Sequence, residues 1–211
     1  MNKENMKTYD PATLWTKTYD EVRDIFEATA SDEHATMMTM ARQGHAHQTR
    51  FRPHSEDRDP YDIHLMRVYM YAMAWAPSDM DVDRLGAVAI FHDYAEDATV
   101  DDPLREVNAV AGSTVTDDVA SLTTPSYPSK KIMREHYVED ASVALHHSPI
   151  SLMVKSCDLF DNTVTLLECP DGMRLGLTKK NAPVTAIAAD LLEEMGGVDS
   201  TLTTALSSVG H

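Results

Sequence analysis

Two kinds of residue are scarce in this sequence, cysteines and basic side chains, and each shortage narrows what the protein can be. Cys157 and Cys169 are the only cysteines among its 211 residues. Two thiols are too few for a disulfide framework, and their spacing does not form a CxxC motif. The N-terminal region has no basic start followed by an apolar run of signal-peptide length. We therefore expect a protein of the reducing cytoplasm.

Long apolar runs and net positive charge are also missing. No segment approaches the ~20 consecutive apolar residues that a membrane span requires. Lysine and arginine total 18 against 34 acidic residues, which gives a formal net charge of −16. Because nucleic acids and anionic membranes bind basic surfaces, we expect neither as a partner. Salt adaptation and simple solubility both account for such an acidic surplus.

The basic residues that are present gather in three short groups. The first comprises Arg50, Arg52, Arg58 and Arg67, and the later two comprise Lys130, Lys131 and Arg134, and Arg174, Lys179 and Lys180. An anionic ligand would have to bind at groups of this kind, because the rest of the surface repels it. For the two later groups, scattered surface charge explains the pattern equally well.

Apolar spacing and helix-start signals predict a protein built from helices. The predicted helices span residues 11–48 with a bend near 30–33, 59–76, 83–95, 100–111, 114–122, 130–146, 149–168 and 179–195. Pro11, Pro60 and Pro103 each follow an aspartate and would occupy the first helical position. No segment alternates apolar and polar residues convincingly, so the predicted fold is all-α. We expect one domain over residues 1–195 and a flexible tail, rich in serine, threonine and glycine, over 196–211.

Six consecutive residues, His92-Asp93-Tyr94-Ala95-Glu96-Asp97, give the strongest chemical signal. The apolar run 85–91 precedes them and would bury one side of a helix, which places the polar residues at a cleft. His92 and Asp93 are metal-type ligands, and a metal that they held would lower the pKa of a bound water. Glu96 and Asp97, one helical turn later, could orient that water or take its proton. The alternative is a capped helix end with solvated acids.

Two ligands hold a divalent ion weakly, so further donors must come from elsewhere in the chain. His64 lies in the first turn of a predicted helix, and Asp158 follows the apolar run 150–154. A carboxylate placed in this way is costly to bury unless a cation or metal meets it. Together with His92 and Asp93, these donors would form a mixed nitrogen and oxygen site suited to Mn, Fe, Co or Zn. Taken singly, His64 could be a histidine at a helix start whose hydrogen bonds are met within the fold, and Asp158 could be a surface acid.

Four motifs, taken in order, resemble the hydrolase domain of the RelA/SpoT family. They read His45-x-x-Gln48-x-Arg50, Pro60-Tyr61-x-x-His64, His92-Asp93-x-x-Glu96-Asp97-x-Thr99 and Lys155-x-x-Asp158-x-x-x-Asn162. Order and spacing agree from about residue 36 to 165, and the ordered set is far more specific than any single motif. In size the chain is similar to the stand-alone metazoan SpoT homologues and the bacterial small alarmone hydrolases. We expect no alarmone synthetase domain, because the chain is too short for one.

The resemblance implies an HD-domain helical bundle that holds one Mn²⁺ or another divalent transition metal. The implied metal ligands are His64, His92, Asp93 and Asp158. The resemblance also implies that Glu96 and Asp97 activate the attacking water and that Arg50 and Asn162 contact the nucleotide. Asn162 lies four residues after Asp158 and therefore on the same helix face. Relatives convert ppGpp or pppGpp to GDP or GTP and pyrophosphate, and the metazoan form also acts as an NADPH phosphatase.

The chain departs from the family pattern on the substrate side. Phe51 stands where relatives usually have a second basic residue, and Leu65 stands where they usually have proline. Arg52 or Arg58 would have to compensate there. The stretch Leu159 to Asp161 also lacks the familiar basic residue. These departures leave open other nucleotide substrates, namely NADPH or a deoxynucleoside triphosphate. A rival of another class is a nucleotide-binding regulator without turnover, and association into a homo-oligomer also stays open.

Overall fold

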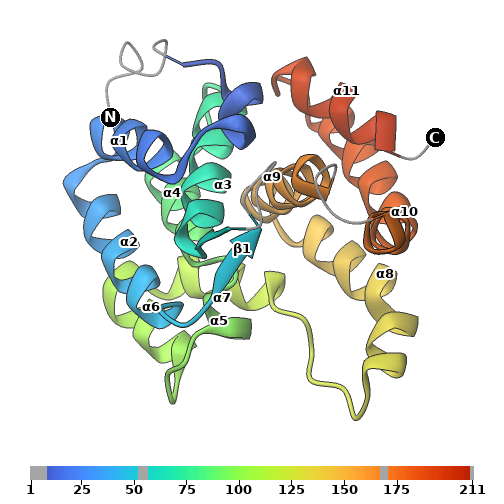
Figure 1. Ribbon diagram of the computed structural model, residues 1–211, viewed down its shortest axis with the longest axis horizontal. Coiled ribbons are helices and arrows are strands. Elements are labelled where there is room, and N and C mark those ends of the chain that lie inside the picture. The colour runs from blue at the N-terminus through green and yellow to red at the C-terminus, as the bar shows by residue number, and fades with distance from the viewer. Residues whose placement is uncertain (1–8, 52–56, 167–170, 210–211) are drawn as a thin grey trace.

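Helices make up most of the computed structural model, which describes residues 9–51, 57–166 and 171–209 (Figure 1). In chain order the elements are the 3₁₀ helix η2 (Pro11–Thr16), α1 (Tyr19–Thr29), α2 (Asp32–Gly44), β1 (Thr49–Phe51), β2 (Arg58–Pro60), α3 (Asp62–Trp75), α4 (Val82–Phe91), α5 (Tyr94–Asp97), α6 (Pro103–Ala111), α7 (Ser113–Leu122), α8 (Lys130–His147), α9 (Pro149–Leu166), α10 (Asp171–Met195) and α11 (Ser200–Val209). The all-α prediction is confirmed, since within these residues the strands are only two short ones.

The first predicted helix, over residues 11–48, is three elements. The bend predicted near 30–33 is confirmed, because α1 ends and α2 begins there. An additional break precedes α1. There, the side chain of Thr18 accepts a hydrogen bond from the backbone of Glu21, and the Glu21 carboxylate accepts one from the backbone of Thr18. This reciprocal capping box starts a new helix.

A short hairpin separates α2 from α3 and corrects one predicted helix start. Strands β1 and β2 pair antiparallel, with Arg50 opposite Asp59. Pro60 therefore ends a strand, and the prediction that it opens a helix is wrong. The helix begins instead at Asp62. Strands of three residues are too short to show an alternating pattern in the sequence.

Helix α3 runs through the centre of the bundle. All of residues 62–75 are buried except Ala74. Figure 1 shows α1 and α2 on one side of α3 and α9 on the other, and α4 packs along it. A helix buried on all sides lies in the core, so each polar side chain that it carries requires a partner. The acidic, imidazole and guanidinium side chains buried on this helix are Asp62, His64 and Arg67.

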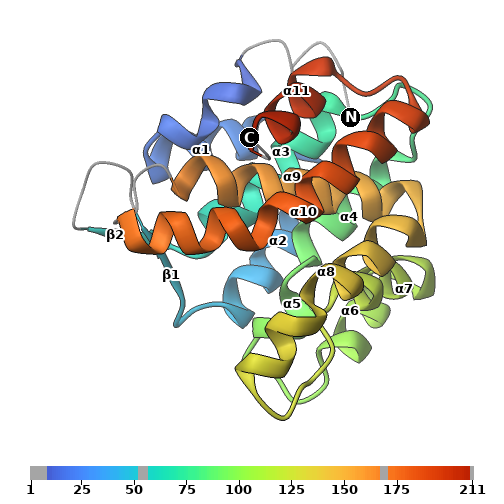
Figure 2. The same cartoon turned by 90° about the vertical axis from the view of Figure 1, so that its right-hand side faces the viewer.

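Helices α10 and α11 correct the predictions for the C-terminal region. Helix α10 begins at Asp171 rather than at the predicted residue 179, and Figure 2 shows it lying alongside α9. The predicted flexible tail over 196–211 is wrong for residues 200–209, which form α11. Leu202 and Leu206, four residues apart on one face, are only 0% and 1% exposed. Two leucines among serines and threonines thus fix this helix to the bundle.

The structure describes one of the two cysteines, and its helices can be compared with the length that a membrane span requires. Cys157 is a buried free thiol whose pKa is raised well above its ordinary value by burial, so it stays protonated at neutral pH. Cys169 lies outside the described residues. Of the helices that the structure describes, none has the length and apolarity that a bilayer crossing demands.

Candidate functional site

The four predicted metal ligands meet where α3, α9 and the junction of α4 with α5 come together. His64 lies on α3, His92 and Asp93 form the junction, and Asp158 lies on α9. The Nε2 atoms of the two histidines are 3.2 Å apart. Oδ1 of Asp158 lies 3.3 Å from Nε2 of His64 and 3.9 Å from Nε2 of His92. Oδ2 of Asp93 lies 3.5 Å from Nε2 of His64 and 3.2 Å from Nε2 of His92. His64, His92 and Asp158 each offer one donor atom, and these three atoms lie within 4.8 Å of one another, which is the size of a divalent metal site. Asp93 approaches the same two histidines but lies outside this group of three.

The junction between α4 and α5 explains how two adjacent residues reach one point. The apolar run 85–91 is entirely buried, as predicted. Helix α4 ends at Phe91 and α5 begins at Tyr94, so the single helix predicted over 83–95 is wrong at this position. On an unbroken helix, adjacent side chains would point about 100° apart. The break lets His92 and Asp93 converge on the same point.

Both imidazole rings are oriented by a hydrogen bond on the side away from the cluster. Nδ1 of His92 lies 2.9 Å from the backbone oxygen of Ala89, and Nδ1 of His64 lies 2.7 Å from Oδ2 of Asp161. Because both partners are acceptors, the neutral rings carry their proton on Nδ1, which leaves the lone pair of each Nε2 facing the cluster. This arrangement is the one that metal-binding histidines adopt.

Asp161 has a role that the sequence interpretation missed. It is fully buried, and its Oδ1 lies 2.7 Å from Nε of Arg67 and 3.3 Å from the hydroxyl of Tyr71. Arg67 is 1% exposed, so the two form a buried ion pair beside His64. His64, Arg67 and Tyr71 recur at helical spacing on α3, and a buried arginine requires an acid opposite. The sequence indicates this requirement, but the packing of α3 against α9 decides which acid meets it.

The carboxylates of the cluster stay ionised despite their burial. Burial alone would raise the pKa of Asp158, but the ammonium of Lys155, 2.9 Å away, and the hydrogen bond from His64 hold the pKa below its ordinary value. Burial also opposes the charge of Asp93, yet His92 and His64 hold its pKa well below the ordinary value. Burial and a nearby arginine disfavour the charged form of His64, but its carboxylate partners raise its pKa to about 9. The cluster therefore favours a cation, either a proton or a metal ion.

The cluster opens into a cavity of about 500 Å³, a volume suited to a small ligand of nucleotide size. Glu96 and Asp97, the residues predicted to activate water, line this cavity together with Asp93. Oε1 of Glu96 accepts a hydrogen bond from the backbone N–H of Thr124, which fixes one end of that carboxylate. Burial and the negative charges of Asp93 and Glu96 raise the pKa of Asp97. A carboxyl group with a raised pKa beside a metal-type cluster suits general-base chemistry.

Arg50 and Asn162, the predicted nucleotide contacts, are connected to each other and to the cluster. Nη1 of Arg50 donates to Oδ1 of Asn162 at 2.9 Å, and Nδ2 of Asn162 donates to Oδ1 of Asp158 at 2.5 Å. The guanidinium lies 4.8 Å from the ring centroid of Tyr61, whose hydroxyl donates to Oδ2 of Asp93 at 2.5 Å. Tyr61 belongs to a sequence motif, but its contact with the cluster cannot be read from spacing. Every predicted site residue thus lies in the cluster or on the cavity wall.

Comparisons with known proteins bear on the fold. No family model matches the sequence, and no curated protein matches it. Among solved structures, one match is a protein described as a metazoan ortholog of SpoT that hydrolyzes ppGpp and plays a role in starvation responses. The alignment has a TM-score of 0.67 and 18% identity, and it covers 85% of this chain and 94% of that one. The chain adopts the fold of this SpoT ortholog.

The shared fold confirms the predicted HD-type helical bundle. The structure of this chain shows where the residues that depart from the motif pattern lie. Leu65 is fully buried on α3, and Leu159 lines the cavity. Arg58 lines the cavity as well. The side chain of Phe51 and the whole of Arg52 lie outside the described residues.

Proposed function

We propose that this chain is a metal-dependent phosphohydrolase that converts ppGpp or pppGpp to GDP or GTP and pyrophosphate. One observation carries the proposal: two imidazole nitrogens lie 3.2 Å apart, each is 3.2 to 3.9 Å from a carboxylate oxygen of Asp93 and of Asp158, and both carboxylates line a cavity of nucleotide size. The fold shared with a SpoT ortholog that hydrolyzes ppGpp supports the same class of reaction.

The donor set fits a divalent transition metal. The proposed ligands are His64, His92, Asp93 and Asp158. Two nitrogens and two oxygens suit Mn²⁺ and its neighbours in the first transition row better than Mg²⁺ or Ca²⁺, which prefer oxygen alone. Both rings also have the outer hydrogen bond that orients a metal-binding histidine. When bound, such a metal lowers the pKa of a coordinated water and offsets phosphate charge.

Glu96 and Asp97 would act on the attacking water. The raised pKa of Asp97 makes its carboxylate a stronger base than an ordinary aspartate, so we assign it the proton of the water. Glu96, held by the backbone N–H of Thr124, would orient the same water. The water oxygen forms a bond to the phosphorus attached to O3′ and the P–O3′ bond breaks. O3′ takes up a proton, which balances the one that Asp97 received from the water, and becomes the hydroxyl of GDP or GTP, and the pyrophosphate is released.

Arg50 would hold a phosphate of the nucleotide. The residue lines the cavity, and its buried Nε forms no hydrogen bond within the described part of the chain, so the donors of the guanidinium are not all used. A phosphate that displaced Asn162 from Nη1 would gain charge-assisted hydrogen bonds from the planar guanidinium. Asn162 would then be free to contact the nucleotide while it stays bonded to Asp158.

Incubation of the purified protein with Mn²⁺ and, separately, ppGpp, pppGpp, NADPH and the deoxynucleoside triphosphates tests the proposal. Pyrophosphate release from ppGpp or pppGpp supports it. Phosphate release from NADPH alone, or triphosphate release from a deoxynucleotide alone, would reassign the substrate. Binding of a nucleotide without turnover of any would identify a regulator in place of an enzyme.

Asp97→Asn is the matched variant for this experiment, because it keeps the side-chain shape and leaves the proposed metal ligands in place. We expect turnover to fall at least ~100-fold, since the amide cannot accept the proton of the water. Metal content, measured by elemental analysis, should be unchanged. Full turnover in this variant would remove Asp97 from the mechanism.

A further inference from the structure

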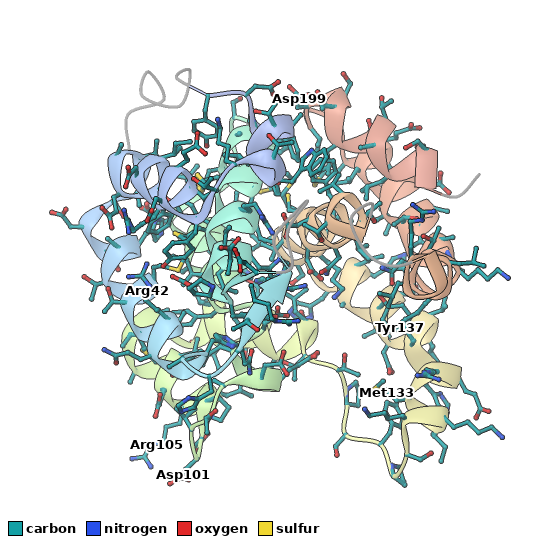
Figure 3. All side chains as sticks on the ribbon, in the orientation of Figure 1. Arg42, Asp101, Arg105, Met133, Tyr137 and Asp199 are labelled. Atoms are coloured by element: carbon teal, nitrogen blue, oxygen red, sulfur yellow. The ribbon has the colours of Figure 1, made fainter. Side chains whose placement is uncertain are left out.

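The cavity continues beyond the proposed reaction centre to a wall formed by α8 and α10. Tyr137 of α8 and Lys180 and Asn181 of α10 line this part of it. In Figure 3, Tyr137 lies where α8 faces α10. The proposed hydrolysis assigns no role to these three side chains.

Lys180 has a charge without an acidic partner. Lys155, the neighbouring cation of the cavity, is paired with Asp158 at 2.9 Å. The ammonium of Lys180 lies instead 3.8 Å from the ring centroid of Tyr137, a cation–π contact, and no ion pair joins it to a carboxylate in the described ranges. Burial and repulsion by Lys155 lower the pKa of Lys180 by more than the attraction of nearby acids raises it. An anionic ligand would supply the negative charge that this ammonium lacks.

Asn181 adds a hydrogen-bond donor beside this charge. The hydroxyl of Tyr137 donates to Oδ1 of Asn181 at 3.1 Å. That bond occupies the amide oxygen and leaves the two N–H donors of the same side chain at the cavity wall. Asn181 is only 7% exposed, so its orientation is fixed by packing. An ammonium and an amide donor side by side match the oxygens of a phosphate group.

We propose that Lys180, Asn181 and Tyr137 form a subsite for a second phosphate group of the ligand, one that does not react. The identity of the reacting group rests on the proposed function. The ligand class is then a nucleoside phosphorylated at two separate positions, with the reacting 3′-diphosphate at the histidine and aspartate cluster and the 5′-phosphates at Lys180. A nucleotide phosphorylated at one position would leave either the cluster or this subsite empty.

Binding of GDP and of guanosine to the Mn²⁺-loaded protein tests the subsite, because the two compounds differ only in the 5′-diphosphate. We expect the parent to bind GDP about tenfold more tightly than guanosine, as one charge-assisted phosphate contact provides. Lys180→Met should lose that difference, and Lys180→Arg should keep most of it. Lys179→Met is the matched control, since Lys179 is an exposed neighbour on the same helix and does not line the cavity. Isothermal titration measures all four proteins.

Equal affinity for GDP and guanosine in the parent would overturn the subsite, and so would equal GDP affinity in Lys180→Met and Lys179→Met. These measurements need no turnover. If the protein binds GDP through Lys180 but leaves ppGpp intact, the result would support the subsite and refute the proposed reaction. If both hold, Lys180→Met should raise KM for ppGpp about tenfold with little change in kcat. Guanosine 3′-diphosphate, which lacks 5′-phosphates, should show no such dependence on Lys180.

Discussion

Among single residues, Asp161 should have a large effect on metal binding although it does not line the cavity. Its carboxylate accepts from Nδ1 of His64 and pairs with Arg67. We expect Asp161→Asn to weaken Mn²⁺ binding roughly 10- to 100-fold, because His64 loses the charged acceptor that fixes its ring. Titration of the metal-free protein with Mn²⁺ measures the change.

Asp118→Asn is the matched control for this variant. Asp118 is also fully buried and pairs with Arg84 at 2.7 Å, but it lies on α7 and is not part of the metal cluster. Both variants should lose stability, because each leaves a guanidinium without its carboxylate. Only Asp161→Asn should lose metal affinity. The same affinity in both variants would contradict a positioning role for Asp161.

His64 predicts a pH dependence of metal binding. In the metal-free protein, burial opposes its charge, but its carboxylate partners raise its pKa from 6.5 to about 9. A metal ion binds only the neutral ring, so below pH 9 it must displace this proton. The apparent affinity for Mn²⁺ should therefore rise up to about tenfold per pH unit toward pH 9 and then level off. Mn²⁺ titrations across this range measure the slope, and a flat profile would contradict ligation by His64.

The same pKa affects folding of the metal-free protein in the opposite direction. A pKa raised in the folded state stabilises the fold when the group is protonated. The contribution of His64 is therefore complete below pH 6.5 and is lost as the pH rises to about 9. Urea unfolding of the metal-free protein at several pH values reports this loss, and bound Mn²⁺ should remove the dependence.

Among the helices, apolar spacing predicts their positions better than their ends. The break before α1 is set by the capping box of Thr18 and Glu21, a signal that Thr-x-x-Glu provides in the sequence. The break between α4 and α5 has no comparable signal, because it depends on packing around His92. The leucines of α11 have helical spacing, but the serine, threonine and glycine content of the segment outweighed this in the sequence interpretation.

Helix α11 gives a prediction for stability. Leu206 is 1% exposed, so Leu206→Ala should lower the free energy of unfolding by about 2–3 kcal/mol through lost burial and the cavity left behind. Leu175→Ala on α10 is the control, since Leu175 is 59% exposed and its removal should change stability by less than about 0.5 kcal/mol. Urea denaturation compares the two. Equal stabilities would mean that α11 does not pack as described.

For the molecule as a whole, the sequence predicts the reaction centre more fully than the rest of the cavity. The metal-type ligands fall in short motifs whose order is itself informative. Lys180 belongs to a basic group for which scattered surface charge was an equal explanation. Whether Lys180 reaches the cavity depends on how α10 lies against α8 and α9, and no local pattern in the sequence encodes that arrangement.

Metal binding should stabilise the entire fold, because the proposed ligands come from three segments far apart in the chain. Mn²⁺ at 100 times its Kd should raise the free energy of unfolding by about 2.7 kcal/mol. For a chain of this size the corresponding rise in Tm is on the order of 5–10 °C, and a chelator should reverse it. Thermal melts monitored by circular dichroism measure the shift. His92→Ala should abolish it, and a shift that persists in this variant would place the metal elsewhere.

The burial of α3 restricts how this protein can diverge. A surface helix tolerates substitution at the positions that face solvent, and these recur every three to four residues. In α3 all of residues 62–75 except Ala74 are buried, so tolerance along it should have no helical period. Changes there must be matched on a neighbouring helix, as Arg67 is matched by Asp161 on α9. Related sequences should therefore differ widely at the exposed helices while α3 and α9 change together.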